Sequence, residues 1–151
     1  MKKLFLAFII CVIALIGCDM NPQSTYYFYS LAELPDGVNT VPIDVTIRGV
    51  WWKPTNYTII MSRGLPSPNC FDRDKVEAEI PMTTFTLKLD GVYLTPTTLK
   101  TVDYLVDSYH VVQSFSTGDL EKGDDYLLEG TTVSTGTPSF TRRNVVRLKV
   151  R

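Results

Sequence analysis

Apolar and polar residues alternate along several stretches of the chain. Residues 41–47, 84–89 and 146–151 place an apolar side chain at every second position, with mostly threonine or charged residues between them. A period of two is typical of β-strands that have one face in a core and the other in water. These stretches therefore predict strands of an antiparallel sheet.

The rest of the chain also favours strands over helices. Further strands are expected at residues 57–62, 76–80, 92–95, 109–115 and 126–133, and only residues 99–107 are expected to form a helical turn or two. The pair Asp90-Gly91 separates two of these strands, and both residue types tolerate the positive φ of a tight hairpin turn. About eight short strands joined by turns predict an all-β antiparallel sandwich, formed by a single domain over residues 26–151.

A short pattern in the last third of the chain makes this expectation more specific. Leu120 is followed three positions later by Gly123, and Tyr126 follows three positions after that, at the start of an expected strand. The pattern resembles the tyrosine corner of immunoglobulin-like and fibronectin type III domains. The resemblance implies an immunoglobulin-like β-sandwich in which the ring of Tyr126 enters the core and its hydroxyl bonds to the upstream backbone. It also implies that residues 126–133 and 144–150 are the last two strands.

The N-terminal segment has a different pattern. Lys2 and Lys3 precede an unbroken apolar run over residues 4–16. At about 1.5 Å per residue, this run is too short to cross a hydrocarbon core of roughly 30 Å. A positive start, a short apolar run and a small residue after it are typical of a secretory signal peptide. We therefore expect an exported protein.

The end of the apolar run, Leu-Ile-Gly-Cys up to Cys18, resembles the lipobox of bacterial prolipoproteins. The resemblance implies that residues 1–17 are removed as a signal peptide, that the Cys18 thiol receives a diacylglyceryl group, and that the new amine is often acylated. Residues 18–25 then form the lipidated cysteine and a short linker. The protein is expected to be extracytoplasmic and anchored by lipid, in a membrane that the sequence does not identify. The alternative is an ordinary signal peptide that leaves Cys18 as a plain thiol.

Composition narrows the classes of function. With 44% apolar residues and a formal charge of −1, the chain fits neither a disordered protein nor a basic binder of nucleic acid. Its one histidine, His110, is expected to be packed or at the surface, and Cys70 to be buried or inert. We predict no catalytic residue, metal or cofactor, and a protein that is not an enzyme. The acidic residues between 72 and 79 lack the spacing of a calcium loop and are expected to form a solvated edge.

Aromatic residues are the best candidates for contact with a ligand or partner. Trp51, Trp52 and Tyr57 lie close together around a turn expected at residues 53–54. Neighbouring residues of a strand face opposite sides, so one tryptophan is expected to enter the core and the other to face outward. An outward tryptophan could stack on a sugar or contact a protein. It could equally cover a sheet edge or rest at a lipid surface.

Two basic residues near the C-terminus, Arg142 and Arg143, are candidates for contact with lipid headgroups. In the expected sandwich, the loop before the last strand lies at the same end as the N-terminus, which the anchor would hold near the membrane. The alternative is that these arginines pair across strands with the acidic residues between 103 and 129.

Two functions fit this sequence. The first is a lipid-anchored protein of the bacterial cell envelope that acts as a non-enzymatic binding or structural module. Its partners would be the membrane, through Cys18, and an envelope protein or a glycan. The alternative is a protein that binds a glycan or small ligand, with a glycan-directed hydrolase as a weaker form, through Trp51, Trp52 and Tyr57. A β-sandwich can support both functions, so the fold does not choose between them.

Overall fold

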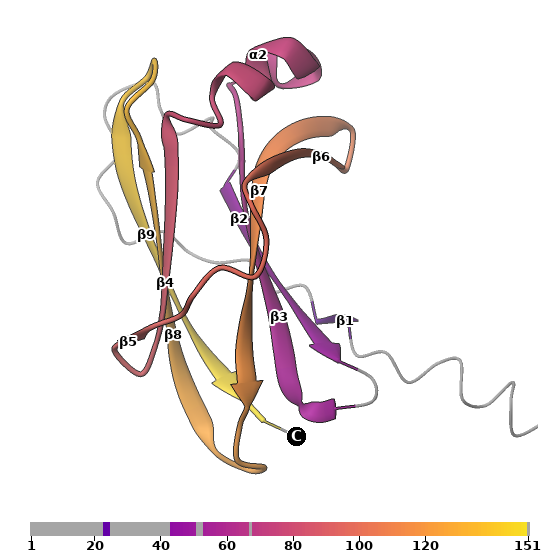
Figure 1. Ribbon diagram of the computed structural model, residues 1–151, viewed down its shortest axis with the longest axis vertical. Helices are drawn as coiled ribbons and strands as arrows, with labels where there is room; N and C mark the ends of the chain where they lie inside the picture. Colours follow the sequence, from indigo (N-terminus) through magenta and orange to yellow (C-terminus); the bar gives the residue numbers. More distant parts are fainter. Residues whose placement is uncertain (1–22, 25–42, 51–52, 67, 151) are drawn as a thin grey trace, which may run out of the picture.

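The computed structural model describes residues 23–24, 43–50, 53–66 and 68–150, and it shows two antiparallel sheets that face each other (Figure 1). Sheet 1 contains, in spatial order, β1 (Gln23–Ser24), β2 (Ile43–Val50), β3 (Lys53–Gly64), β7 (Ser108–Asp119) and β6 (Thr101–Leu105). Sheet 2 contains β5 (Val92–Tyr93), β4 (Thr83–Leu89), β8 (Asp125–Ser134) and β9 (Phe140–Lys149). The 3₁₀ helix η2 (Asn69–Phe71) and the helix α2 (Arg73–Ala78) lie between β3 and β4 in the chain. The predicted all-β sandwich is confirmed.

The order of the strands explains how the sandwich closes. β2, β3, β7 and β6 follow the order A, B, E and D of an immunoglobulin-type sandwich, and β4, β8 and β9 follow the order C, F and G. The chain therefore crosses between the sheets after β3, β5 and β7. The short strands β1 and β5 extend the sheets at one edge each.

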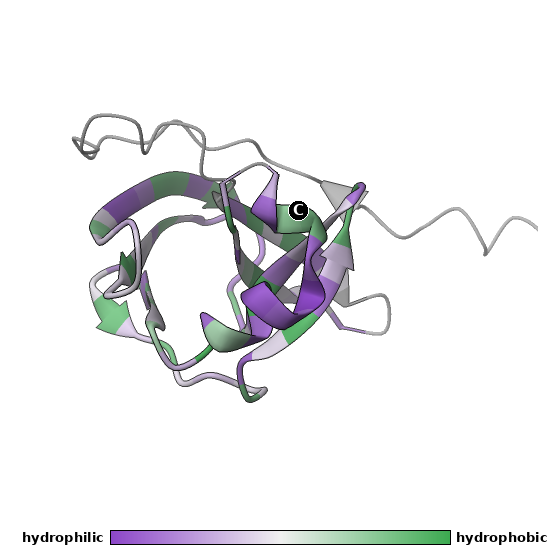
Figure 2. Cartoon of the chain, turned by 90° about the horizontal axis from the view of Figure 1, so that it is seen from above, coloured by the Kyte–Doolittle hydropathy of each residue, from purple (hydrophilic) through white to green (hydrophobic). Residues whose placement is uncertain are grey.

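The core lies between the sheets and is built from alternate residues of the strands. In β4, for example, Phe85, Leu87 and Leu89 are buried, whereas Thr86 between the first two is exposed and Lys88 between the last two is half-buried. The opposite sheet contributes Ile59 and Met61 from the centre of β3. The helix α2 is mostly hydrophilic, as Figure 2 shows, and it contributes one side chain, Val76, to this core.

The hairpin predicted at Asp90-Gly91 is confirmed. Leu89 pairs with Val92, so Asp90 and Gly91 alone connect β4 to β5. Their φ angles of 47° and 81° are both left-handed, which an aspartate tolerates and a glycine adopts without steric cost.

The strand expected at residues 76–80 is wrong, because this segment belongs largely to α2. The side chain of Asp72 caps the helix by accepting a hydrogen bond from the Lys75 N–H at 3.3 Å. A six-residue helix at the end of the sandwich needs only one apolar side chain to seal the core, and Val76 is that residue. The sequence pattern of so short a helix does not show a period of 3.6.

The helical turns expected at residues 99–107 are also wrong. Residues 101–105 form β6, which pairs with β7, and Val106 and Asp107 form the turn between them. Neither residue at this turn is a glycine or asparagine, so the usual signal of a hairpin is missing from the sequence.

The described part of the N-terminal segment is the short strand β1. Gln23 pairs with Arg48 and Ser24 pairs with Ile47, so sheet 1 begins inside the linker predicted over residues 18–25. The predicted signal peptide and Cys18 lie outside the described residues.

Candidate functional site

The predicted aromatic site is described only in part. Trp51 and Trp52 lie outside the described residues, and the turn expected at residues 53–54 is instead the beginning of β3. Tyr57 is half-buried and packs against the core, and its backbone N–H donates to the Thr117 Oγ1 at 3.0 Å. Tyr57 therefore contributes to the packing of sheet 1, and a ligand contact by Trp51, Trp52 or Tyr57 stays a prediction.

The loop between β7 and β8 contains the hydrogen bond that a tyrosine corner requires. The hydroxyl of Tyr126 accepts a hydrogen bond from the backbone N–H of Glu121 at 3.1 Å. Tyr126 and Leu120 both pack against the core, and Gly123 between them has a φ of 93°, which favours glycine. The Gly123 N–H also donates to the Val150 carbonyl at 3.0 Å. The Leu120 N–H donates to the Thr55 carbonyl of β3 at 3.0 Å, so the loop is fixed to both sheets at this end of the sandwich.

The two arginines near the start of β9 have different surroundings. Arg143 is exposed and forms an ion pair with Glu129 of the neighbouring strand β8. Arg143 thus pairs across strands with one of the acidic residues between 103 and 129, which was the expected alternative to headgroup contact. Arg142 is half-buried and faces the same side of the strand as the buried Phe140 and Asn144. Contact of either residue with headgroups stays a prediction.

The outer face of sheet 2 carries basic, apolar and acidic side chains, the acidic ones being Asp125 opposite Lys149 and Glu129 opposite Val145. Arg147 lies opposite Leu127 in the register of β8 and β9, and the exposed Lys149 follows on the same face. On the neighbouring strands, the Lys88 ammonium lies 4.6 Å from the centre of the Tyr93 ring. We call the patch of Leu127, Val145, Arg147 and Lys149 the β9 face.

A buried ion pair that the sequence analysis did not predict closes the other end of the sandwich. The Nη1 of Arg63 donates to the Glu79 Oε2 at 2.8 Å and to the Thr83 Oγ1 at 3.0 Å. Its guanidinium carbon lies 5.3 Å from the centre of the Phe140 ring. The acidic stretch therefore divides: Asp74 and Glu77 are exposed on α2, as expected, whereas Glu79 belongs to this buried pair.

The one histidine is packed into the structure. His110 is 2% exposed, and its Nε2 lies within hydrogen-bond distance of the Ser108 hydroxyl. Burial lowers the pKa of His110 because the charged imidazolium loses its hydration, and the nearby Asp44 carboxylate opposes this shift. The ring is therefore held neutral at neutral pH.

The buried cysteine and the described acidic residues show no sign of a metal site. Cys70 is a free and buried cysteine, in agreement with its expected place. Within residues 23–24, 43–50, 53–66 and 68–150, no group of three or more His, Cys, Asp or Glu side chains is arranged to hold a metal ion. Among the same residues, no helix has the length and hydropathy needed to cross a bilayer.

The most exposed large apolar side chain in the described part of the chain is at the turn between β6 and β7. Val106 is 91% exposed, and Tyr104 beside it is 56% exposed. This turn lies in residues 99–107, where a helical turn or two was expected.

Comparisons with known proteins add no family to this description. The chain matches no model of a protein family, and no curated protein is similar to it.

Proposed function

We propose that the chain is a lipid-anchored protein of a bacterial cell envelope, and that its sandwich is a non-enzymatic binding module of immunoglobulin-like type. The Leu-Ile-Gly-Cys box, the preceding apolar run and the two N-terminal lysines support the anchor. The strand order and the hydrogen bond from Glu121 to Tyr126 support the immunoglobulin-like type.

The observation that carries the proposal is the short distance between the lipobox and the sheet. Gln23 already pairs with Arg48, so the chain from Cys18 to β1 spans at most about 18 Å. A lipid on Cys18 would therefore hold the β1 edge of sheet 1 close to the membrane. β6 forms the opposite edge of the same sheet, about 19 Å away at the usual strand spacing. The exposed turn after β6 would then point away from the anchor and be free to meet a partner.

Labelling with a fatty-acid analogue tests the anchor. Full-length protein produced in bacteria is expected to incorporate the label and to partition into detergent. The variant Cys18→Ala is expected to lose both properties. Cys70→Ala is the matched control, since Cys70 is the other cysteine of the predicted mature chain, and it should label normally. Equal labelling of wild type and Cys18→Ala would contradict the proposal.

The alternative function, a binder of glycans or small ligands, depends on Trp51 and Trp52. Both lie outside the described residues, and Tyr57 is half-buried beside the core. It stays a prediction, tested by glycan binding of the Trp51→Ala and Trp52→Ala variants.

A further inference from the structure

The turn between β6 and β7 has an unusual conformation for its sequence. Leu105 pairs with Ser108, so Val106 and Asp107 form a two-residue turn, and their φ angles of 40° and 65° are both left-handed. Hairpin turns of this kind favour Asn-Gly or Asp-Gly. A valine with positive φ is an outlier, because its branched Cβ crowds the backbone.

The other tight hairpin of the protein shows the contrast. The β4–β5 turn has the same left-handed pair of residues and uses Asp90-Gly91, which fit it. At the β6–β7 turn, the strained position instead presents an apolar side chain that is 91% exposed. Strain that is retained at an exposed apolar residue points to a function for that side chain.

Hydrogen bonds hold this turn in place. The Tyr104 hydroxyl donates to the Asp107 carboxylate at 2.8 Å, and the Tyr104 N–H donates to the Asp103 carboxylate at 2.8 Å. The Ser108 hydroxyl donates to the Leu105 carbonyl at 2.9 Å. The ring of Tyr104 also packs edge-on against Tyr109, with 5.8 Å between the ring centres. The turn is therefore organised before any partner arrives, which lowers the entropic cost of binding.

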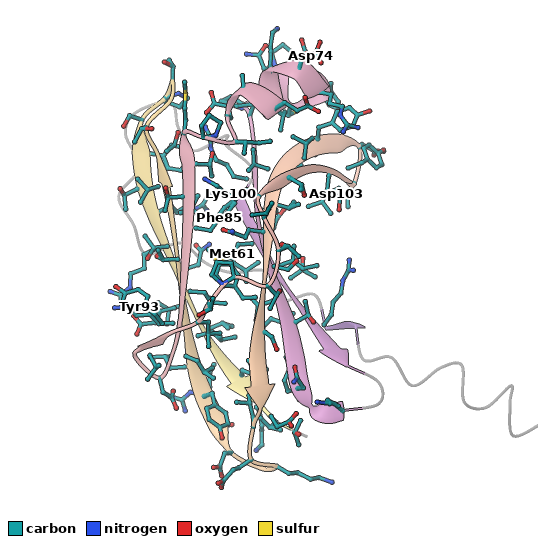
Figure 3. All side chains as sticks on the ribbon, viewed as in Figure 1. Met61, Asp74, Phe85, Tyr93, Lys100 and Asp103 are labelled. Carbon is teal, nitrogen blue, oxygen red and sulfur yellow. The ribbon has the colours of Figure 1, made fainter. Side chains whose placement is uncertain are left out.

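Carboxylates flank the exposed valine, although the neighbouring helix α2 also carries Arg73 and Lys75, which pair with Glu77 and Asp72. Asp103 and Asp107 belong to the turn region, and Asp74 lies on α2, which packs against β6 (Figure 3). None of these three carboxylates is in an ion pair within the described part of the chain. We call Asp103, Tyr104, Val106 and Asp107 the acidic tip. A partner for this tip needs an apolar contact for Val106 and cations for the carboxylates.

The chain itself presents such a surface on the β9 face. Leu127 is 39% exposed and lies opposite Arg147, while Val145 and Lys149 flank Arg147 on the same side of β9. Arg147 and Lys149 are exposed and form no ion pair among the described residues. Asp125 lies opposite Lys149, whereas Arg147 faces the apolar Leu127, so Arg147 is the cation of this face that we expect to meet a carboxylate. Figure 1 shows the β6–β7 turn and β9 on opposite sides of the sandwich, so the two surfaces are separate.

We propose that the acidic tip of one copy docks on the β9 face of a second copy. This contact joins two different surfaces, so its repetition builds a row of copies rather than a closed pair. A second copy would then be the partner of the binding module, so this proposal rests on the proposed function. Anchoring in one membrane would concentrate the copies and thereby strengthen a small contact.

Cross-linking of the full-length protein in its membranes tests the docking. Treatment with formaldehyde followed by detection with an antibody is expected to give a ladder of dimer, trimer and larger species. Val106→Gly is expected to abolish the ladder, because it removes the apolar contact while glycine suits the left-handed backbone. Val92→Gly is the control, since Val92 is an exposed valine on the other hairpin, and it should leave the ladder intact.

Charge reversal tests the pairing of the two surfaces. Asp103→Lys and Arg147→Asp, each expressed alone, are expected to abolish the ladder, because each places like charges in contact. Co-expression of the two variants is expected to restore it, because every contact then joins opposite charges. Glu121→Lys makes the same charge change at an exposed residue of the β7–β8 loop and should have no effect.

Fatty-acid labelling of the same samples separates failure of the docking from failure of the anchor. A labelled wild-type protein that remains monomeric would overturn the docking and leave the proposed function standing. A ladder that survives both charge reversals would also overturn it. A single dimer band would overturn the docking as well, and so would cross-links that join the protein only to a different protein.

Discussion

The guanidinium of Arg63 donates to the carboxylate of Glu79 at 2.8 Å inside the sandwich, where the Arg63 side chain is 0% and the Glu79 side chain 14% exposed. The pair joins β3 to the segment that follows α2. Gly136 packs directly against it, since a Cβ at this position would lie 2.5 Å from the Glu79 Oε2. One ion pair therefore fixes the helix, sheet 1 and the β8–β9 loop at the same end of the molecule.

Removal of the Glu79 charge should destabilise the protein strongly. Glu79→Gln leaves the buried guanidinium without its counter-charge, and we expect the free energy of unfolding to fall by about 3 kcal/mol. Urea unfolding followed by circular dichroism measures this change. Glu77→Gln is the control, because Glu77 forms an exposed ion pair with Arg73, and it should have little effect.

A double variant separates charge from packing at this site. The Nε and Nη2 of Arg63 have no hydrogen-bond partner in the described part of the chain, so the arginine is incompletely satisfied there. Arg63→Met combined with Glu79→Leu removes both charges and keeps apolar volume, and it should recover most of the stability lost in Glu79→Gln. A double variant as unstable as the single one would contradict this interpretation.

Replacement of Val106 by glycine should stabilise the fold. A left-handed non-glycine residue costs on the order of 1–3 kcal/mol, whereas glycine adds roughly 0.5–1 kcal/mol of entropy cost. Because the valine is almost fully exposed, little burial is lost. We therefore expect Val106→Gly to raise the free energy of unfolding by about 1 kcal/mol in urea. Val92→Gly in the extended strand β5 should lower it, and a fall for both variants would mean that Val106 is not strained.

The hydroxyl of Tyr126 should contribute a measurable part of the stability. Tyr126→Phe keeps the ring against the core and leaves the Glu121 N–H without its acceptor, so we expect a loss of about 1 kcal/mol. Thermal and urea unfolding measure it. Tyr93→Phe is the control at an exposed tyrosine, where the change should stay within about 0.5 kcal/mol. Equal effects of the two variants would show that the hydrogen bond adds nothing.

Strict alternation predicted several strands directly, and β-branched and aromatic content predicted others, such as residues 109–115 in β7. β4 is an example of alternation, since each buried residue from Phe85 to Leu89 is followed or preceded by a polar one. In β3, Ile59, Met61 and Arg63 occupy every second position on the core face, although the apolar Ile60 between the first two blurs this pattern. The strand expected at residues 57–62 ends one residue before Arg63.

The acidic tip could not be predicted in the same way. Its conformation depends on Val106, a residue that favours extended strands and disfavours positive φ. Pairing of β6 with the longer β7 overrides this preference, and that pairing is a long-range property of the sheet. Arg63, the buried partner of Glu79, likewise lies in another element, β3. Local patterns thus predicted most of the strands but not β6, while the contacts between elements required the structure.

Burial of His110 should make stability depend on pH in a narrow range. In the folded protein, desolvation lowers the pKa of His110, and the Asp44 carboxylate partly opposes this shift. In the unfolded chain, the pKa has its ordinary value of about 6.5. Below pH 6.5 the unfolded state therefore binds more protons than the folded state, and stability falls as the pH falls, by at most about 1.4 kcal/mol per pH unit.

Urea unfolding between pH 7.5 and pH 5.5 tests this dependence. His110 is the one histidine of the chain, and ordinary carboxylates titrate mainly below this range. The wild type should lose stability as the pH falls from 6.5 to 5.5, and His110→Gln should give a flatter profile over the same range. The size of the loss in the wild type would report how far burial lowers the pKa of His110. A wild-type profile as flat as that of His110→Gln would show that the ring accepts a proton in the folded protein as easily as in the unfolded chain.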